Sequence, residues 1–196
     1  MTTASLERSP SGIRMASWES SPTEGCKEGD LKRENPIRIL ITGGTIDKEY
    51  DPITGELTFA KSHLSNMLTQ VRCRAGFVLE EIMLKDSLEM RGEDREEILK
   101  RCLQCSESQV IVTHGTDTMV ETARVLDRKI EGKTVALVGA IIPYAFGASD
   151  ALFNLGCAFS AVQALQPGVY ITMNGKIFPW DNVRKNRESG EFEELT

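Results

Sequence analysis

The sequence predicts an α/β fold: a three-layer, doubly wound, mainly parallel sheet flanked by helices, of the Rossmann or flavodoxin-like kind. Two observations predict it. From Ile37 onward, strand-like apolar runs alternate with helix-like amphipathic stretches. Two of those runs lead directly into Thr42-Gly-Gly-Thr45 and His114-Gly-Thr-Asp117. Because ligands of parallel sheets bind at the carboxyl ends of strands, we expect these two segments to meet around one pocket.

The expected strands are the apolar runs at residues 37–41, 77–84, 109–113, 134–138 and 168–173. Between them, apolar side chains recur at the spacing of a helix. The last such stretch follows Ser149-Asp150, an N-cap pair. The helical stripes are Leu64, Met67, Leu68 and Val71; Met119, Val120, Ala123 and Leu126; and Leu152, Leu155, Phe159 and Val162.

Length and charge limit the class of protein. A chain of 196 residues with 40% hydrophobic residues suits one globular domain. The net charge of −6 disfavours nucleic acid as a partner, because binding to a phosphate backbone needs a basic surface. No uninterrupted apolar stretch is long enough to span a bilayer, so we expect a soluble protein with no membrane partner.

The chain divides into three expected regions. Residues 1–35 are rich in Ser, Glu, Pro and Gly and predict a disordered segment without a secretory leader. Residues 36–187 form the expected domain, and residues 188–196 an acidic tail. Within the domain, residues 47–60 make a connection longer than a tight turn requires. This loop is either a lid over the site or a variable surface excursion.

The five cysteines are an odd number, and without a secretory leader they predict free thiols in a reducing cytoplasm. Cys102-Leu-Gln-Cys105 has the C-x-x-C pattern, but no second pair stands at zinc-ligand spacing. Ile98, Cys102 and Cys105 fall on one helical stripe. Buried thiols are therefore the favoured interpretation, with metal or redox chemistry as the alternative, and we expect no cofactor and no metal.

The two segments that follow strands each have a structural and a functional interpretation. The glycines after Thr42 allow unusual backbone angles, so that segment is consistent with a turn capped by threonines. Asp117 is an N-cap for the helix that carries Met119, a reactive carboxylate, or both. The second segment favours function, because it places another hydroxyl and a carboxylate at another strand end.

These segments resemble the bacterial-type L-asparaginases, whose amino-terminal domain carries Thr-Gly-Gly-Thr-Ile and His-Gly-Thr-Asp-Thr-Met in this order. The resemblance runs from residue 37 to residue 186 and implies a fold of the asparaginase N-terminal-domain type. Three further segments are similar to the family in sequence order: Asp86-Ser87-Leu88-Glu89-Met90; Gly139-Ala-Ile-Ile-Pro143 with Ser149-Asp150-Ala-Leu-Phe-Asn154-Leu; and Met173-Asn174-Gly with Asp181-Asn-Val183-Arg-Lys185-Asn186.

The resemblance implies that Thr45 is the nucleophile that attacks the side-chain amide carbon. A threonine hydroxyl is too weakly acidic to do this unaided. The family's second cluster, which supplies the base and the proton path, maps to Thr116, Asp117 and Lys185. Without the other motifs, Lys185 would be interpreted as a solvated surface charge. The family's mobile-loop tyrosine has no partner at its usual spacing, and we expect Tyr50 to hydrogen-bond Thr45 instead.

Acyl transfer also needs donors for the developing oxyanion, and we expect the backbone amides near Gly44 and Thr116 to provide them. The resemblance implies that Ser87 contacts the substrate α-carboxylate and that Asp117 pairs with the α-ammonium. A turn cap is the structural alternative for the serine. The expected substrate-binding set is completed by Glu89, Gly115 and Ala140.

The chain departs from the family at several positions. Leu88-Glu89 replaces the usual Gln-Asp, and Asp47-Lys48-Glu49-Tyr50 replaces small residues. Ile142 stands in place of an arginine and Ala151 in place of a glycine. Full-length relatives carry a carboxyl-terminal domain that helps to close a neighbouring subunit's pocket. We therefore expect a homo-oligomer in which a second protomer supplies the missing wall.

The leading functional hypothesis is an amidohydrolase that converts L-asparagine, or a similar small amide, into the acid and ammonia. A catalytically silent amino-acid-binding protein is one alternative, and an amidotransferase-type subunit that feeds ammonia to a partner is another. The motifs carry this hypothesis, because doubly wound sheets alone host many chemistries.

Overall fold

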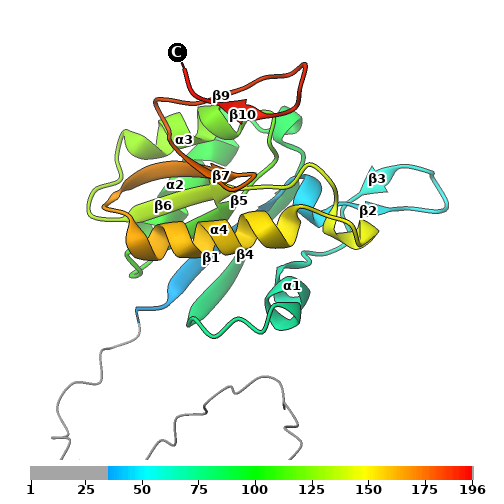
Figure 1. Ribbon diagram of the computed structural model, residues 1–196, viewed down its shortest axis with the longest axis horizontal. Helices are drawn as coiled ribbons and strands as arrows, with labels where there is room; N and C mark the ends of the chain where they lie inside the picture. Colours follow the sequence, from blue (N-terminus) through cyan, green and yellow to red (C-terminus); the bar gives the residue numbers. More distant parts are fainter. Residues whose placement is uncertain (1–34, 196) are drawn as a thin grey trace, which may run out of the picture. The chain divides into compact units, whose positions relative to one another are not determined.

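A six-stranded sheet forms the centre of the computed structural model, which describes residues 35–195. Its strands lie in the order β4-β1-β5-β6-β7-β8 (Figure 1). All neighbours pair in parallel except β8, which is antiparallel to β7. The strands are β1 (Ile37–Gly43), β4 (Phe77–Lys85), β5 (Gln109–Thr113), β6 (Thr134–Val138), β7 (Gly168–Met173) and β8 (Lys176–Pro179).

The order of the parallel strands is that of flavodoxin-like sheets. Numbered as they follow in the chain, the five parallel strands lie in the order 2-1-3-4-5. The strand order reverses between β1 and β5, and ligands of such sheets bind in the crevice at this switch point. The predicted α/β fold class is confirmed, and the two strands that precede the motifs are the two at the switch point.

Helices cover both faces of the sheet (Figure 1). Residues of α1 and α4 share one hydrophobic cluster with the sheet, and residues of α2 and α3 share the other. In β1, Leu40 belongs to one cluster while Ile39 and Ile41 belong to the other, because successive side chains of a strand point to opposite faces. The helices are α1 (Leu64–Gln70), α2 (Gly92–Gln104), α3 (Met119–Asp127) and α4 (Ala151–Ala164).

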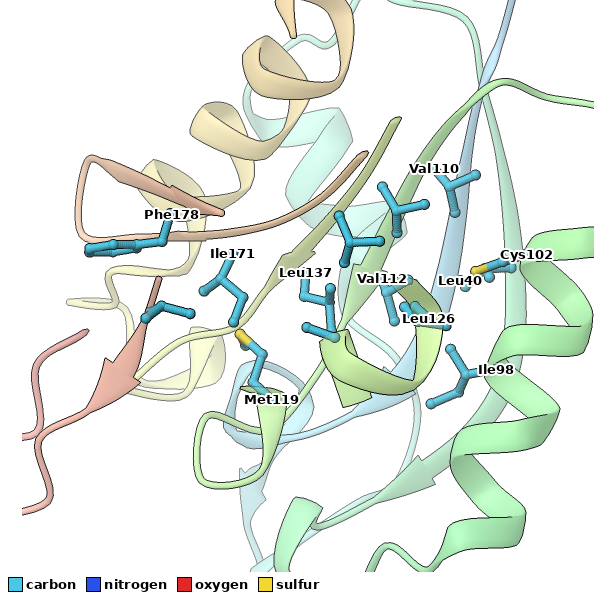
Figure 2. Packing of buried hydrophobic residues seen from close by; sticks show 14 of the residues in the cluster. Leu40, Ile98, Cys102, Val110, Val112, Met119, Leu126, Leu137, Ile171 and Phe178 are labelled. Carbon is cyan, nitrogen blue, oxygen red and sulfur yellow. The ribbon is translucent and has the colours of Figure 1, made fainter. Parts of the chain in front are cut away.

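Figure 2 shows the cluster between the sheet and the α2–α3 side. Val112 and Leu137 project from the sheet, while Ile98 comes from α2 and Met119 from α3. All four are fully buried. This packing fixes α3 against the carboxyl half of the sheet, directly after the His114–Asp117 segment.

Strand β8 was not predicted, but the turn that precedes it has a recognisable sequence. Asn174 and Gly175 join it to β7, with φ values of 52° and 79°. A two-residue hairpin of this kind requires positive φ at both positions, and Asn-Gly is the pair that it favours. The sequence therefore contained the information for this strand.

The acidic end of the domain differs from the expected tail over residues 188–196. Strands β9 (Arg184–Lys185) and β10 (Phe192–Glu193) pair in an antiparallel ladder, with Phe192 opposite Lys185. Phe192 is 4% exposed and joins the hydrophobic cluster of α2 and α3. Burial of this aromatic ring holds the segment on the domain as far as residue 193.

The expected disorder of residues 1–35 lies outside the described residues, apart from Asn35. Within residues 35–195, we find no helix that is both long enough and apolar enough to cross a membrane.

Candidate active site at the switch point

The turns after β1 and β5 are in backbone contact. A Cβ atom on Gly44 would lie 2.3 Å from the nitrogen of Gly115, and the φ of Gly44 is 82°. A Cβ on Gly43, with φ at 91°, would lie 2.5 Å from the nitrogen of Lys85. Neither the conformation nor the space admits a side chain at these positions. The glycines thus bring the two motif segments together.

The threonines of the first segment have different environments. Thr42 is buried, and its Oγ1 donates to the carbonyl oxygen of Thr113 at 2.6 Å, so it joins β1 to β5. Thr45 begins the 3-10 turn η1 (Thr45–Asp47) and is only partly buried. Within residues 35–195 its hydroxyl makes no hydrogen bond.

Lys185 joins the second segment from the far end of the chain. Its Nζ donates to Thr116 Oγ1 at 2.8 Å and to Asp117 Oδ1 at 2.7 Å. The lysine side chain is 14% exposed and that of Asp117 is 37% exposed. Thr118, not Asp117, occupies the N-cap position of α3. The carboxylate of Asp117 is therefore held by the lysine rather than by the helix.

Ser87 packs against the backbone of Gly115 in the second motif segment. It begins the 3-10 turn η2 (Ser87–Glu89) and is 1% exposed. A Cβ on Gly115 would lie 2.6 Å from its Oγ. That oxygen has no hydrogen-bond partner among the described residues. A buried hydroxyl without a partner is costly, which is typical of a group that meets a ligand.

The backbone amides of the site differ in availability. The N–H of Gly44 donates to the carbonyl oxygen of Lys85 at 3.0 Å, so it is already occupied. The N–H groups of Thr45 and Thr116 have no hydrogen-bond partner in the part of the chain that the structure describes. Of the amides expected near Gly44 and Thr116, these two are the ones that remain free to bind an anion.

The structure does not place Tyr50 and Glu89 with this cluster. Tyr50 lies in the hairpin of β2 (Glu49–Tyr50) and β3 (Leu57–Thr58), is 57% exposed, and makes no hydrogen bond with Thr45. The short ladder turns the expected lid segment into a hairpin that carries the phenol outward. Glu89 is exposed at the end of η2, beside a surface cavity that Lys85 and Arg91 also line. Their roles stay predictions.

Gly139 and Ala140 follow β6, and Gly139 packs against the second motif segment. Ala140 is fully buried directly after β6. A Cβ on Gly139 would lie 2.4 Å from the carbonyl oxygen of His114. The loop after β6 therefore packs directly against the His114–Asp117 segment.

Hydrogen bonds and an ion pair fix the base of the β2–β3 hairpin. Asp47 is fully buried, and its Oδ1 accepts from Ser62 Oγ at 3.0 Å and from the N–H of His63 at 2.8 Å. Burial raises the pKa of the Asp47 carboxyl, an effect that these hydrogen bonds partly offset. On the other side of the base, Lys48 pairs with Asp86, directly before Ser87.

His114 is a residue to which the sequence alone assigned no role. It is fully buried, with Nδ1 2.7 Å from the carbonyl oxygen of Gly115 and Nε2 2.8 Å from Thr122 Oγ1. Burial lowers the pKa of its ring to about 4. The available signal was its position, because it follows a buried strand directly and stands beside the reactive hydroxyls.

The C-x-x-C pair lies away from this site. Cys102 is buried inside α2, and Cys105 follows the end of that helix. Burial raises the pKa of the Cys102 thiol to about 12. Both thiols are free, and among residues 35–195 no group of three or more His, Cys, Asp or Glu side chains could hold a metal ion.

Comparison with known proteins identifies related sequences. Residues 36–192 match the family described as "Asparaginase, N-terminal". The chain is 31% identical over 165 residues to a glutamyl-tRNA(Gln) amidotransferase subunit of Methanococcus vannielii, which covers 81% of this chain and 38% of that protein. It is 31% identical over 159 residues to L-asparaginase 2 of Escherichia coli, which covers 76% of this chain and 46% of that enzyme.

Solved structures show the same similarity. The thermostable L-asparaginase from Thermococcus kodakarensis superposes with a TM-score of 0.71 and 27% sequence identity, over 82% of this chain and 51% of that one. The chain therefore spans about half the length, or less, of these relatives.

Proposed function

This chain belongs to the asparaginase family, and from that premise we propose that it is an amidohydrolase that hydrolyses the side-chain amide of L-asparagine or a similar small amide. One observation carries the proposal. The Lys185 amine contacts both the Thr116 hydroxyl and the Asp117 carboxylate, next to a turn whose Thr45 hydroxyl has no hydrogen-bond partner among the described residues. A nucleophile, a base and a group that orients the base are the parts that acyl transfer needs.

The proposed reaction has two steps. The Thr45 oxygen attacks the amide carbon, and its proton passes through the Thr116 hydroxyl to the Lys185 amine. The adjacent Asp117 carboxylate stabilises the ammonium that forms. The tetrahedral intermediate then collapses: its C–N bond breaks, the nitrogen takes the proton held by Lys185 and leaves as ammonia, and an ester of Thr45 remains. Water then cleaves this ester and releases the acid and the free hydroxyl.

The remaining groups are assigned to binding. The unpartnered Ser87 hydroxyl donates to the substrate α-carboxylate, and the exposed part of Asp117 accepts from the α-ammonium. The free N–H groups of Thr45 and Thr116 stabilise the oxyanion. Ala140, which is fully buried, is the remaining member of the proposed substrate-binding set.

Release of ammonia tests this proposal directly. The purified chain is assayed with L-asparagine, L-glutamine and near analogues, beside Thr45→Ala and Lys185→Met. We expect the wild type to release ammonia from at least one amide. We expect Lys185→Met to be slower by about 10²–10⁴-fold, the contribution of a positioned base, and Thr45→Ala, which lacks the nucleophile, to lose at least as much. The absence of release from the whole panel would contradict the proposal. So would wild-type rates in Thr45→Ala.

A second candidate is favoured by the similarity to an amidotransferase component. In that case the chain would make ammonia for a partner protein, and turnover would rise when the partner is added. A catalytically silent binder would behave differently again: L-aspartate would raise its melting temperature while no amide was turned over.

We also propose that the working form is a cytoplasmic homo-oligomer. In this arrangement a second protomer would supply a wall of the pocket over Ser87 and Asp117. The free thiols of Cys73, Cys102, Cys105 and Cys157 fit a reducing compartment. Light scattering on the purified chain measures the oligomeric state, and a monomer with full activity would contradict this arrangement.

A further inference from the structure

The ring of His114 has both nitrogens engaged inside the core. A carbonyl oxygen only accepts, so the 2.7 Å contact with Gly115 places the ring hydrogen on Nδ1. The neutral ring then accepts at Nε2, and Thr122 Oγ1 donates to it at 2.8 Å. Thr122 projects from α3 and is fully buried. The two hydrogen bonds fix the tautomer and the orientation of the ring.

This ring controls the direction of one peptide group of the site. The Gly115 carbonyl is turned toward His114, and in a trans peptide the following N–H points the opposite way. That N–H belongs to Thr116 and therefore points away from the buried ring. It has no hydrogen-bond partner within residues 35–195.

The backbone of His114 is also fixed, by contacts with β6 and the residue that follows it. The N–H of His114 donates to the carbonyl oxygen of Val138 at 2.8 Å, and Gly139 lies directly against the His114 carbonyl. The ring hydrogen bond acts directly on the Gly115 carbonyl, and it fixes a peptide group that follows a glycine, a residue that accepts many conformations.

From this geometry we propose that Thr122 and His114 are positioning residues that hold the Thr116 amide as an oxyanion donor. The inference rests on the proposed amidohydrolase function. Neither side chain touches the substrate. Thr122 orients His114, His114 orients the Gly115 carbonyl, and the carbonyl sets the direction of the Thr116 N–H. A preorganised donor of this kind acts on the transition state more than on the ground state.

Substitution at Thr122 separates positioning from packing. Thr122→Val keeps the shape and removes the hydroxyl, whereas Thr122→Ser keeps the hydroxyl. We expect Thr122→Val to lower kcat about tenfold with KM changed by less than about threefold, and Thr122→Ser to restore most of kcat. Thr172→Val is the matched control, because it removes another fully buried hydroxyl that bonds only a backbone carbonyl. We expect it to leave kcat unchanged.

Substitution at His114 extends the test. His114→Asn retains an N–H donor near the Nδ1 position, and His114→Leu has none. We expect His114→Leu to lose about 10²–10³-fold in kcat, the cost of an oxyanion donor, and His114→Asn to lose much less. Equal losses in the two variants would overturn the proposal, as would a rise in KM at constant kcat. Equal losses in Thr122→Val and Thr122→Ser would assign Thr122 to packing and overturn it too.

A readout without turnover distinguishes this inference from the proposed function. Nitrogen-15 spectra of histidine-labelled protein at neutral pH report the tautomer, and we expect the His114 ring to carry its hydrogen on Nδ1. A hydrogen on Nε2, with ammonia release intact, would overturn only the positioning role. A wild-type chain that turns over no amide would overturn the proposed function, and the catalytic role of the relay with it.

Discussion

At the scale of single residues, burial and missing hydrogen bonds mark the side chains to which we assign substrate binding. Ser87 illustrates this best, because its hydroxyl is buried, lies beside Gly115, and has no partner among the described residues. The sequence pointed to this serine only through family resemblance, since a serine after a strand is consistent with a simple cap. Its missing hydrogen bond is a property of the folded chain and is invisible in the sequence.

Ser87→Ala should separate substrate binding from folding. Removing an unsatisfied buried hydroxyl should leave the melting temperature equal or slightly higher, because a desolvation penalty disappears. KM should rise about ten- to hundred-fold, since a hydrogen bond to a charged group is worth roughly 1.5–3 kcal/mol. Thermal unfolding and steady-state kinetics measure the two effects. A lower melting temperature with unchanged KM would identify the serine as structural.

The buried His114 should make stability depend on pH. Its folded pKa is about 4, against an ordinary value of 6.5, so between these values the unfolded chain binds more protons. Stability should therefore be complete above pH 6.5 and fall as the pH drops toward 4, by up to about 3 kcal/mol. Urea unfolding of wild type and His114→Asn at neutral and acidic pH measures this. An equal pH dependence of the two proteins would contradict it.

At the scale of elements, the β9–β10 hairpin adds Lys185 to a site whose other residues follow the regular strands. Local apolar runs predicted all five parallel strands, including the edge strand β4, whose residues are exposed or only partly buried. The β2–β3 and β9–β10 hairpins are too short to show any period. The position of Lys185 depends on Phe192, which lies opposite it in the hairpin and is buried in the hydrophobic cluster of α2 and α3. The residues of these helices are far from Phe192 in the sequence, so this contact cannot be predicted from a local pattern.

The β9–β10 hairpin should be necessary for activity. Phe192→Ala removes the buried ring that holds β10, so Lys185 should lose its fixed position and ammonia release should fall at least tenfold. Arg184→Ala is the control, because it removes only an exposed ion pair with Glu193 in the same hairpin. Circular dichroism checks that the domain stays folded. Equal activity in both variants would show that the hairpin does not position the lysine.

Asp47 should control the opening of the β2–β3 hairpin. Asp47→Ala removes the acceptor of Ser62 and of the His63 N–H, whereas Asp47→Asn retains an oxygen there. We expect hydrogen exchange across residues 48–61 to accelerate at least tenfold in the alanine variant, since each lost bond to a charged group is worth about 1.5–3 kcal/mol. Identical exchange in the two variants would refute this role for the carboxylate.

At the scale of the whole molecule, strand order explains why distant motifs form one site. The 2-1-3-4-5 order makes β1 and β5 neighbours, so segments about seventy residues apart lie in contact at the switch point. The sequence predicted this meeting because both motifs follow buried strands. The direction of a loop side chain such as Tyr50 cannot be predicted from the sequence, because it depends on how the loops pack, and the role expected of this tyrosine stays a prediction.

The central claim is that Thr45 becomes acylated with the help of Lys185. Acid quenching during turnover of L-asparagine, followed by peptide mass spectrometry, measures it most directly. We expect an aspartyl group on the peptide that contains Thr45, absent from Thr45→Ala and formed more slowly in Lys185→Met. Ammonia release without any adduct on that peptide, or with the adduct on another residue, would contradict it.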